Sequence, residues 1–576
     1  MKQLLYLPIV AVLFAVSMSS CKNDVPKEAK YIPKEAGFVL VLDPGQMKDK
    51  LQKGGISIDT LLSRVFKGDS LDVKDKARIE ELKNNAGINW SNKMFVFGQQ
   101  KSHADNSTSN TFSLIAGLED AGKLAAYLQK QEELKGKSIT KEKDYSHIST
   151  SDGSMLAWND QQVIVTMYTH TLKPVYDTTA MTFKKPLPAN IEAEMKQEVA
   201  HYFTQSIKES LADLSVFTDM FKEKADGYVF TSANSSLAAL SMMSFQLPKL
   251  EELIKDNYAT ATLSFEDGRI LATSTSYTNQ LLSSVLKQYA GPTVNLSMLE
   301  HYPSQNINGI MLAAFNPEIF GGLLKQLEVE GLVNNFLEKS GLSSQDLYKS
   351  LKGDIAVIVS DLGTTTTEPE AKQDERSMLR KKPIGKMILS APVGDKASFA
   401  KVMDKAVEQG VLVKQNNVYK AGNLFTFMGM YIQADDKNLV IASDSLTYAA
   451  YMSQTSKVAI NKEALDRFKG KSTVFYFDIA NTLNGFSKDA PAGFQQSLTT
   501  AKNTFKDVLA TSDNFDGKSV KARLEVMMQN EKQNSLVTLT SLITDIAVDM
   551  RLQAKREKES EEKLFPGGVP AIIRTN

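Results

Sequence analysis

The chain has 576 residues, and its 67 Lys and Arg side chains balance its 67 Asp and Glu side chains, so the formal net charge is zero. Nucleic-acid-binding proteins normally carry a basic excess that replaces phosphate counterions, so this composition argues against that class. Hydrophobic residues make up 42% of the chain, enough for a buried core. The length predicts several domains.

Residues 1–20 have the layout of a secretory signal peptide. Lys2 gives a short basic start, an apolar run extends from Leu4 to Val16, and small residues follow up to Ser20. A membrane-spanning helix needs about 20 apolar residues, and this run is shorter. We therefore expect residues 1–20 to be cleaved from the mature protein.

The single cysteine of the sequence, Cys21, stands directly after this segment, with Met18 where lipoprotein signals more often have Leu. A lone free thiol is a liability in an oxidising envelope, and a thioether-linked lipid removes it. We predict that Cys21 is lipidated and that its acyl chains hold the protein on a membrane. The alternative is an ordinary signal peptide that ends near a cysteine. An Asp directly after the cysteine would signal retention in the inner membrane, and this chain has Lys22 there, which favours the outer membrane. The sequence does not predict which leaflet of that membrane holds the protein.

Internal repetition predicts the domain organisation. A β-rich run at Gly37–Asp43 ends in Asp43-Pro44, and a similar run at Gly309–Phe315 ends in Asn316-Pro317. An Asp or Asn followed by Pro suits a helix N-cap with proline at the first helical position, so each run should be a strand that leads into a helix. We predict a polar tether at 21–30, two homologous halves at 31–300 and 301–564, and a tail at 565–576.

The correspondence between the halves continues in the same order. Helices are expected at Asp120–Gln131 and Asp395–Gln409, and hairpin turns at Trp158-Asn159-Asp160 and Ala434-Asp435-Asp436. A further pair of turns is expected at Asp267-Gly268 and Asp516-Gly517. The matching strands, in chain order, are Met94–Phe97 with Ile355–Val359, Phe112–Ala116 with Met387–Ala391, Val163–Val165 with Leu439–Ile441, Tyr228–Phe230 with Val474–Phe477, and Ile270–Ala272 with Ala522–Leu524.

Hairpin turns require antiparallel neighbours, so the predicted class is α+β, with antiparallel sheets packed by helices on one face. A doubly wound parallel sheet is the less favoured alternative, and simple strand–helix alternation is the alternative to true duplication. The polar stretches Gln99–Asn110 and Asp361–Lys382 have too few apolar residues to offset the entropy cost of ordering them, and they are expected to be mobile loops. Ser535–Leu552 contains three charged residues and predicts an amphipathic helix of a soluble domain.

The mature chain resembles a family of Bacteroidetes-type envelope lipoproteins classed as a domain of unknown function. The features that carry the resemblance are the junction at Cys21, the opening Tyr31-Ile32-Pro33-Lys34-Glu35-Ala36 and the strand Gly37–Asp43. The resemblance implies an envelope location and brings no catalytic residues with it.

We find no motif that predicts a catalytic, cofactor or metal site. The five histidines are far apart in sequence and lack the spacing of zinc hydrolases, although a triad formed in three dimensions stays open. Two S-x-x-K matches at Ser284–Lys287 and Ser398–Lys401 are a frequent chance pattern. The triplet Ser512-Asp513-Asn514 lies beside a turn without a K-T-G companion. The histidines are His103, His147, His170, His201 and His301.

The remaining motifs are better explained by structure. Acidic turns such as Asp435-Asp436 lack the ligand spacing of a calcium loop. Gly-Lys-Ser triplets begin at Gly136, Gly470 and Gly517, and all lack the leading glycine of a phosphate-binding loop. Alternating aromatic residues on two predicted strands favour core packing over a sugar-stacking platform. These aromatic residues are Tyr228, Phe230, Phe475 and Phe477.

Two functional hypotheses follow. The favoured one is a lipid-anchored envelope protein that binds or scaffolds an unidentified envelope partner without catalysis, because no catalytic motif accompanies the anchor at Cys21. The alternative is an envelope enzyme of the hydrolase kind, with an unfamiliar site in a cleft between the two halves.

Overall fold

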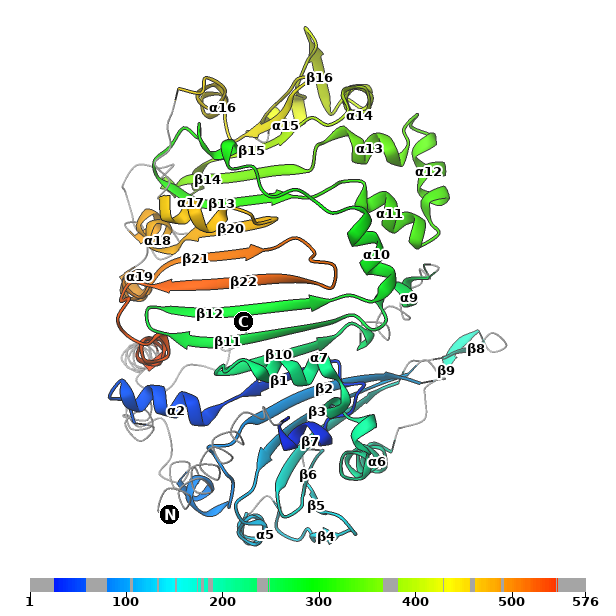
Figure 1. Ribbon diagram of the computed structural model, residues 1–576, viewed down its shortest axis with the longest axis vertical. Coiled ribbons are helices and arrows are strands. Elements are labelled where there is room, and N and C mark those ends of the chain that lie inside the picture. The colour runs from blue at the N-terminus through cyan, green and yellow to red at the C-terminus, as the bar shows by residue number, and fades with distance from the viewer. Residues whose placement is uncertain are drawn as a thin grey trace, which may run out of the picture. The chain divides into compact units, whose positions relative to one another are not determined.

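The protein is described by a computed structural model (Figure 1). It describes residues 25–57, 80–103, 107–131, 134–150, 153–172, 175–177, 181–184, 190–235, 247, 249–365, 382–427, 429–455, 462–487, 492–544 and 546. The signal segment 1–20, Cys21 and the tail 565–576 lie outside the described residues. The chain forms two compact units. Unit 1 comprises Met1–Pro44, Ile79–Met242 and Thr260–Thr262, and unit 2 comprises Gly45–Arg78, Met243–Ala259 and Leu263–Asn576.

The framework of unit 1 is an antiparallel sheet. Its paired strands follow the order β10 (Gly227–Ser232), β1 (Phe38–Leu42), β2 (Met94–Ser102), β3 (Thr108–Gly117), β7 (Gln162–Thr171), β6 (Ser154–Trp158), β5 (Ser146–Ser149) and β4 (Thr140–Lys141). A separate hairpin joins β8 (Val175–Asp177) to β9 (Thr182–Lys184).

The two faces of this sheet differ, as the alternation along β1 illustrates. Val39 and Val41 are buried, whereas Phe38, Leu40 and Leu42 are exposed. Successive residues of a strand point to opposite faces, so a strand that is apolar throughout places apolar side chains on both. One face of unit 1 is therefore core, and the other presents apolar side chains to solvent.

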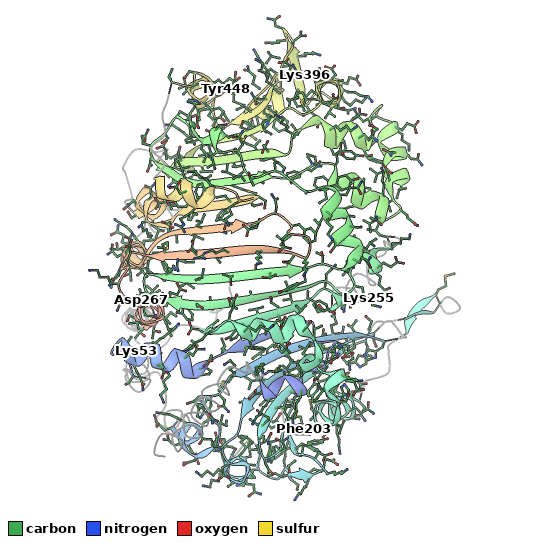
Figure 2. All side chains as sticks on the ribbon, in the orientation of Figure 1. Lys53, Phe203, Lys255, Asp267, Lys396 and Tyr448 are labelled. Carbon is green, nitrogen blue, oxygen red and sulfur yellow. The ribbon has the colours of Figure 1, made fainter. Side chains whose placement is uncertain are left out.

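Helices pack on the buried face of unit 1. The Phe97 ring of β2 lies 5.3 Å from the Tyr202 ring of α6, and Phe217 of α7 lies 5.4 Å from Phe230 of β10. Phe203, also on α6 and labelled in Figure 2, stacks on Tyr145 at 4.7 Å. Helices of this unit include η1 (Lys27–Tyr31), α5 (Ala121–Lys130), α6 (Ile191–Thr204), η3 (Ile207–Glu209), η4 (Leu211–Asp213), α7 (Ser215–Asp219) and η5 (Met220–Lys222).

Unit 2 contains a longer antiparallel sheet. Strand β11 (Tyr258–Glu266) precedes β12 in the chain. The pairing order is β12 (Arg269–Tyr277), β22 (Ser519–Met528), β21 (Phe505–Ser512), β20 (Thr473–Asp478), β13 (Ile307–Ala314), β14 (Asp354–Thr365), β15 (Lys382–Pro392), β19 (Asn438–Ala442), β18 (Tyr431–Ala434), β17 (Val418–Ala421) and β16 (Leu412–Gln415).

Helices gather at both ends of the strands of unit 2. In Figure 1, α10 to α13 follow one end of the strands, and α17, α18 and α19 lie at the opposite end. Helices of this unit include α2 (Pro44–Lys53), α9 (Leu250–Ile254), α10 (Gln280–Gln288), η6 (Leu296–Leu299), α11 (Ile319–Gln326), α12 (Glu330–Glu338), α13 (Ser344–Ser350), α14 (Lys396–Glu408), α15 (Asn423–Phe427), α16 (Ser445–Met452), α17 (Lys462–Phe468), α18 (Ile479–Ser487) and α19 (Ala492–Thr504).

The core of unit 2 covers one face of its middle strands. Leu312 of β13, Val474 of β20 and Ala356 of β14 are buried together with Tyr302 and with Phe468 of α17. By contrast, β12 contains no buried residue among its nine positions. The strands around β12 and β22 therefore leave much of the sheet accessible to solvent.

The predicted α+β class with a large antiparallel sheet is confirmed, and local signals located several elements closely. Helices α5 and α14 begin directly after Asp120 and Asp395, and these carboxylates accept hydrogen bonds from the Lys123 and Ser398 amides at 3.0 and 2.8 Å. An N-cap carboxylate of this kind satisfies amide donors that the first turn leaves unpaired.

Two expectations were wrong. Helix α2 begins at Pro44 as predicted, but α11 begins at Ile319, because Asn316 and Pro317 first form a tighter turn in which the Ile319 amide bonds to the Asn316 carbonyl at 3.1 Å. The polar stretches expected to be loops are partly strand. Strand β2 continues to Ser102 and β3 starts at Thr108, while the other stretch contributes the ends of β14 and β15.

Residues 535–544 of the expected amphipathic helix are helical. Leu536 and Val537 from this segment pack against Leu51 and Ile56 within unit 2. Among the described residues, no helix combines the length and apolar content that crossing a bilayer requires.

Candidate functional site

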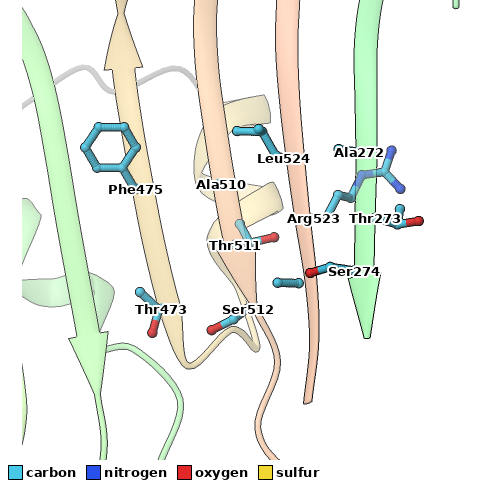
Figure 3. Close-up of a pocket in the computed structure, with 11 residues that line it drawn as sticks. Ala272, Thr273, Ser274, Thr473, Phe475, Ala510, Thr511, Ser512, Arg523 and Leu524 are labelled. Carbon is cyan, nitrogen blue, oxygen red and sulfur yellow. The ribbon is translucent and has the colours of Figure 1, made fainter. Parts of the chain in front are cut away.

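A hollow of about 360 Å³ lies on the sheet of unit 2, across β12, β22, β21 and β20 (Figure 3). Its surface is almost entirely apolar. The lining residues are Ala272, Thr273, Ser274, Thr473, Phe475, Ala510, Thr511, Ser512, Ala522, Arg523 and Leu524. Sites for small molecules usually have volumes of about 300–1,000 Å³, so the hollow is large enough for a ligand.

Strand register explains the shape of this hollow. Leu524 of β22 lies opposite Ala272 of β12 and Ala510 of β21, and Ala510 lies opposite Phe475 of β20. Residues directly opposite each other point to the same face, so these four side chains form one row across the sheet. Phe475 and Leu524 are 46% and 40% exposed. Ala510 leaves a depression between these two larger side chains, and Ala272 leaves another on the other side of Leu524.

A second row lies beside the first. Ser274, Ala522, Ser512 and Thr473 are mutually opposite on the same four strands. These side chains are small, and the Ser512 hydroxyl is 3.0 Å from the Ser472 hydroxyl. The two rows together form a shallow trough that runs across the strands. We refer to the residues lining this hollow as the trough.

The opposite face of the same strands is charged. The Glu525 carboxylate, whose side chain is 8% exposed, accepts hydrogen bonds from Arg269, Arg467 and Arg523 at 2.9, 2.7 and 2.8 Å. Burial works to raise the pKa of Glu525, but hydrogen bonds from Arg523 and Arg467 hold it below its ordinary value. This cluster joins β12, β22 and α17, so it supports the strands from which the trough is built.

Two further carboxylates, Asp478 and Asp507, lie opposite each other on β20 and β21. Burial raises the pKa of both. Asp478 accepts a hydrogen bond from the Asn481 amide at 2.8 Å, which caps α18. Among the described residues, none donates a hydrogen bond to Oδ1 of Asp507. The ionised form of Asp507 therefore lowers the free energy of unfolding.

We predict that Asp507→Asn stabilises the protein at neutral pH by about 1–3 kcal/mol, the usual cost of a buried polar group without a partner. A carboxyl whose folded pKa is raised contributes stability below its unfolded pKa and loses it as pH rises through the folded pKa. The gain should therefore shrink toward acid pH. Urea unfolding between pH 4 and 8 measures it, with Asp466→Asn at a half-exposed carboxylate as control. Equal stability of variant and parent at neutral pH would contradict the prediction.

Unit 1 also presents apolar side chains on its open face. The Phe38 ring lies 6.2 Å from the Phe112 ring, and Met167 lies opposite Phe112 on β7. Gly98 lies opposite both phenylalanines, and a side chain there would collide with the Phe38 ring, at 2.2 Å from its nearest carbon. The glycine thus allows Phe38 to lie flat on the sheet. An exposed apolar cluster of this kind commonly marks an interaction surface.

A polar network lies in unit 1 where β2 ends and β3 begins, beside the last residues of β7. The Ser107 hydroxyl is 2.7 Å from Nε2 of His170, and Nδ1 of His170 is 2.7 Å from a carboxylate oxygen of Glu194. The ring of His103 stacks on His170 with centroids 4.8 Å apart, and its Nε2 is 2.9 Å from the Ser109 hydroxyl. Ser107 and Ser109 belong to the β2–β3 hairpin, His170 to β7 and Glu194 to α6.

The structure brings together two of the five histidines considered in the sequence. His103 and His170 share the network just described, although they are 67 positions apart (170 − 103) in the chain. His147 is buried on β5, with Nε2 3.5 Å from Glu142. His201 lies in the last turn of α6. Among the described residues, no group of three or more His, Cys, Asp or Glu is arranged to hold a metal ion.

Residues of the S-x-x-K matches and of the Ser512-Asp513-Asn514 triplet form hydrogen bonds and ion pairs with other groups. The Ser284 hydroxyl donates to the Leu281 carbonyl at 2.7 Å, within its own helix. Lys401 forms an ion pair with Asp346 at 2.8 Å, and Asp513 pairs with Lys471 at 2.7 Å. The glycines of the three Gly-Lys-Ser triplets, at 136, 470 and 517, have φ of 85°, 74° and 98° and therefore lie in turns.

The expectation of core packing held for part of the aromatic set. Tyr228 and Phe230 are buried in unit 1, as predicted. Phe475 is exposed in the trough, so core packing was the wrong expectation there. Successive residues of a strand point to opposite faces of the sheet, so the position of an aromatic residue along the strand decides which face it occupies. In unit 2 the solvent-exposed face carries apolar side chains too, so an aromatic residue on a strand is not necessarily in the core.

Comparisons with known proteins add little to this description. No protein-family model matches the sequence, and no curated protein matches it. Among solved structures, crystal forms IV and I of TP0453 align with TM-scores of 0.21 and 0.22 at 9% identity. The alignments cover 43% and 47% of this chain and 79% and 82% of those chains.

Proposed function

We propose that this protein is a lipid-anchored envelope protein that binds an apolar ligand with an unbranched hydrocarbon chain in the trough of unit 2. The observation that carries the proposal is the hollow of about 360 Å³ with an apolar surface. A hydrocarbon chain needs no hydrogen-bond partners, and ten of the eleven lining residues are uncharged. Its linear form matches the trough, which runs across four strands along a row of small side chains and the neighbouring row that holds Phe475 and Leu524.

The energetic basis is the exposure of large apolar side chains beside this floor. Phe475 and Leu524 present apolar area to water on the open face. Covering apolar surface gains about 25 cal/mol per Å² removed from water. A chain laid between the two side chains would cover part of both, while Ala510 between them allows it to approach the backbone.

A fluorescent fatty acid, cis-parinaric acid, tests this proposal on the mature chain in water. We expect saturable binding that palmitate displaces. Ala510→Trp should fill the floor of the trough and weaken binding by at least about tenfold, or roughly 1.4 kcal/mol. The control is Leu446→Trp, at an 81% exposed leucine of α16 in the same unit. Thermal unfolding must verify that both variants fold. Unchanged binding by a folded Ala510→Trp variant would sink the assignment.

The envelope address is part of the same proposal. The support is the signal-like segment 1–20 followed by Cys21, together with the resemblance to Bacteroidetes-type envelope lipoproteins. Acyl chains on Cys21 would hold the protein to the outer membrane, and a hydrocarbon ligand would then be available at the bilayer surface.

We further propose that the chain arose by duplication, with halves at 31–300 and 301–564. The support is a shared strand order. The pairing β10–β1–β2–β3–β7–β6–β5–β4 has the same chain order as β20–β13–β14–β15–β19–β18–β17–β16.

Matching local contacts support duplication independently. Asn159 accepts from the amides two and three residues later at 2.9 Å each, and Asp435 does so at 2.8 and 2.9 Å. The Leu118 amide bonds to the Gln161 carbonyl at 2.8 Å, as Val393 does to Lys437 at 2.7 Å.

A further inference from the structure

We propose that Ser107 is a nucleophile for acyl transfer from small carboxylic esters to water, with His170 as its general base and Glu194 as a positioning residue. This activity goes beyond ligand binding in the trough and uses unit 1 alone. The geometry that carries it is the pair of 2.7 Å contacts that link Ser107 to His170 and His170 to Glu194. Nucleophile, base and orienting carboxylate within hydrogen-bond reach are the recurring features of such sites.

Strand register places the first two groups together. Ser109 lies opposite His170 on β7, and Thr108 lies opposite Thr171. Ser107 comes directly before Thr108 in the chain, so it lies just beyond the first paired residue of β3. The backbone closes the hairpin, with the His103 amide bonded to the Ser107 carbonyl at 3.0 Å. Ser107 is therefore held by the sheet, and its hydroxyl contacts Nε2 of His170 rather than Nδ1.

Helix α6 supplies the carboxylate. Asn190 caps this helix through the Ala193 amide at 3.1 Å, and the Glu194 amide bonds to the Asn190 carbonyl at 3.0 Å. Glu194 thus occupies the first turn, where it contacts Nδ1 of His170. A carboxylate at Nδ1 favours the tautomer that carries its proton there, which leaves Nε2 free to accept the proton of Ser107. The stacked His103 ring restricts rotation of His170.

The reaction balances with water as the second substrate. Oγ of Ser107 bonds to the ester carbonyl carbon while Nε2 of His170 takes the hydroxyl proton. The carbon–alkoxide bond then breaks, and the alkoxide leaves as an alcohol with that proton. Water next attacks the acyl carbon, again losing a proton to His170, and the bond to Oγ breaks. The acid is released and Ser107 regains its proton.

The burial of Ser107 decides which probe is suitable. Ser107 is 1% exposed, so a bulky reagent is a poor test. Diisopropyl fluorophosphate is small. Its phosphorus bonds to an activated serine oxygen with loss of fluoride, while the hydroxyl proton passes to the base. We expect time-dependent phosphorylation of Ser107 on the intact mature chain, located by fragmentation of the tryptic peptide that spans Ser102–Lys123.

Variants separate reactivity from structure. Ser107→Ala should abolish labelling of this peptide, and Glu194→Gln should slow it by at least about 100-fold, whereas Glu194→Asp should restore part of the rate. Ser113→Ala is the matched control, because Ser113 lies on the same strand β3 and its hydroxyl contacts Thr166 at 3.0 Å rather than His103 or His170; its labelling rate should be unchanged. Turnover of p-nitrophenyl acetate should follow the same order.

The proposal is overturned if Ser107 stays unlabelled in the folded protein under conditions that label a serine hydrolase in the same tube. It is equally overturned if labelling persists at the parent rate in folded Glu194→Gln or His170→Ala variants, because the contacts would then be only structural. Neither result affects the trough of unit 2, whose test is ligand displacement.

Discussion

Changing Cys21 to Ala is expected to release the protein from the membrane fraction and to eliminate incorporation of an alkyne-labelled palmitate. The physical reason is that each buried methylene contributes about 0.8 kcal/mol, and two or more acyl chains are needed for stable attachment. Among the described residues, no helix is long and apolar enough to replace this anchor. Cell fractionation and in-gel fluorescence measure the two effects.

A neighbouring change provides the control. Ser17→Ala alters the segment before the cleavage boundary and leaves Cys21 in place, so membrane attachment and labelling should persist. If Cys21→Ala remains labelled and membrane-bound, or if the parent protein retains residues 1–20 without acyl groups, the proposed address is wrong.

Replacing Glu525 by Ala is expected to destabilise the protein by about 2–3 kcal/mol. The change leaves three arginine side chains without the carboxylate that accepts their hydrogen bonds at 2.7–2.9 Å. Breaking a fully buried pair costs about 3–5 kcal/mol. The value here should be smaller because the arginine side chains are 29–43% exposed, and water screens their charges.

Chemical denaturation of the mature chain measures this loss, and its acid dependence gives a second readout. A glutamate whose folded pKa is lowered contributes stability above its unfolded pKa and loses it as pH falls through the folded pKa. The difference between parent and variant should therefore narrow at acid pH. Glu531→Ala, at an exposed pair with Lys506, should cost at most about 1 kcal/mol. Equal costs for the two variants would disprove a special role for Glu525.

Local signals made much of the fold predictable. The hairpin turn at Asn159 and the cap at Asp395 lie where the sequence placed them, because each depends on hydrogen bonds to amides two or three residues away. Local hydrogen bonds also explain why the predicted helix start at Asn316 was wrong. There the side chain accepts from the Glu318 amide at 3.0 Å, a turn that competes with the expected cap.

The polar network of unit 1 was missed for a different reason. The stretch Gln99–Asn110 has Ala104 as its single apolar residue, and we expected a mobile loop. Some of its polar side chains instead contact β7 and α6, as Ser107 does with His170 and Lys101 with Glu198. The alternation of serine and threonine before an apolar strand indicated that the strand begins earlier. It did not identify His170 or Glu198 as the residues that these side chains contact.

By itself, the sequence determined the proposed anchor at Cys21, the α+β class and the positions of caps and turns, because these depend on residues close together in the chain. Only the tertiary structure decided which side chains meet. Ala272 and Leu524 are neighbours in the trough although 252 positions (524 − 272) separate them in sequence. Pairing between distant strands sets both the register and the face that each side chain occupies, and a shift of one residue would reverse that face.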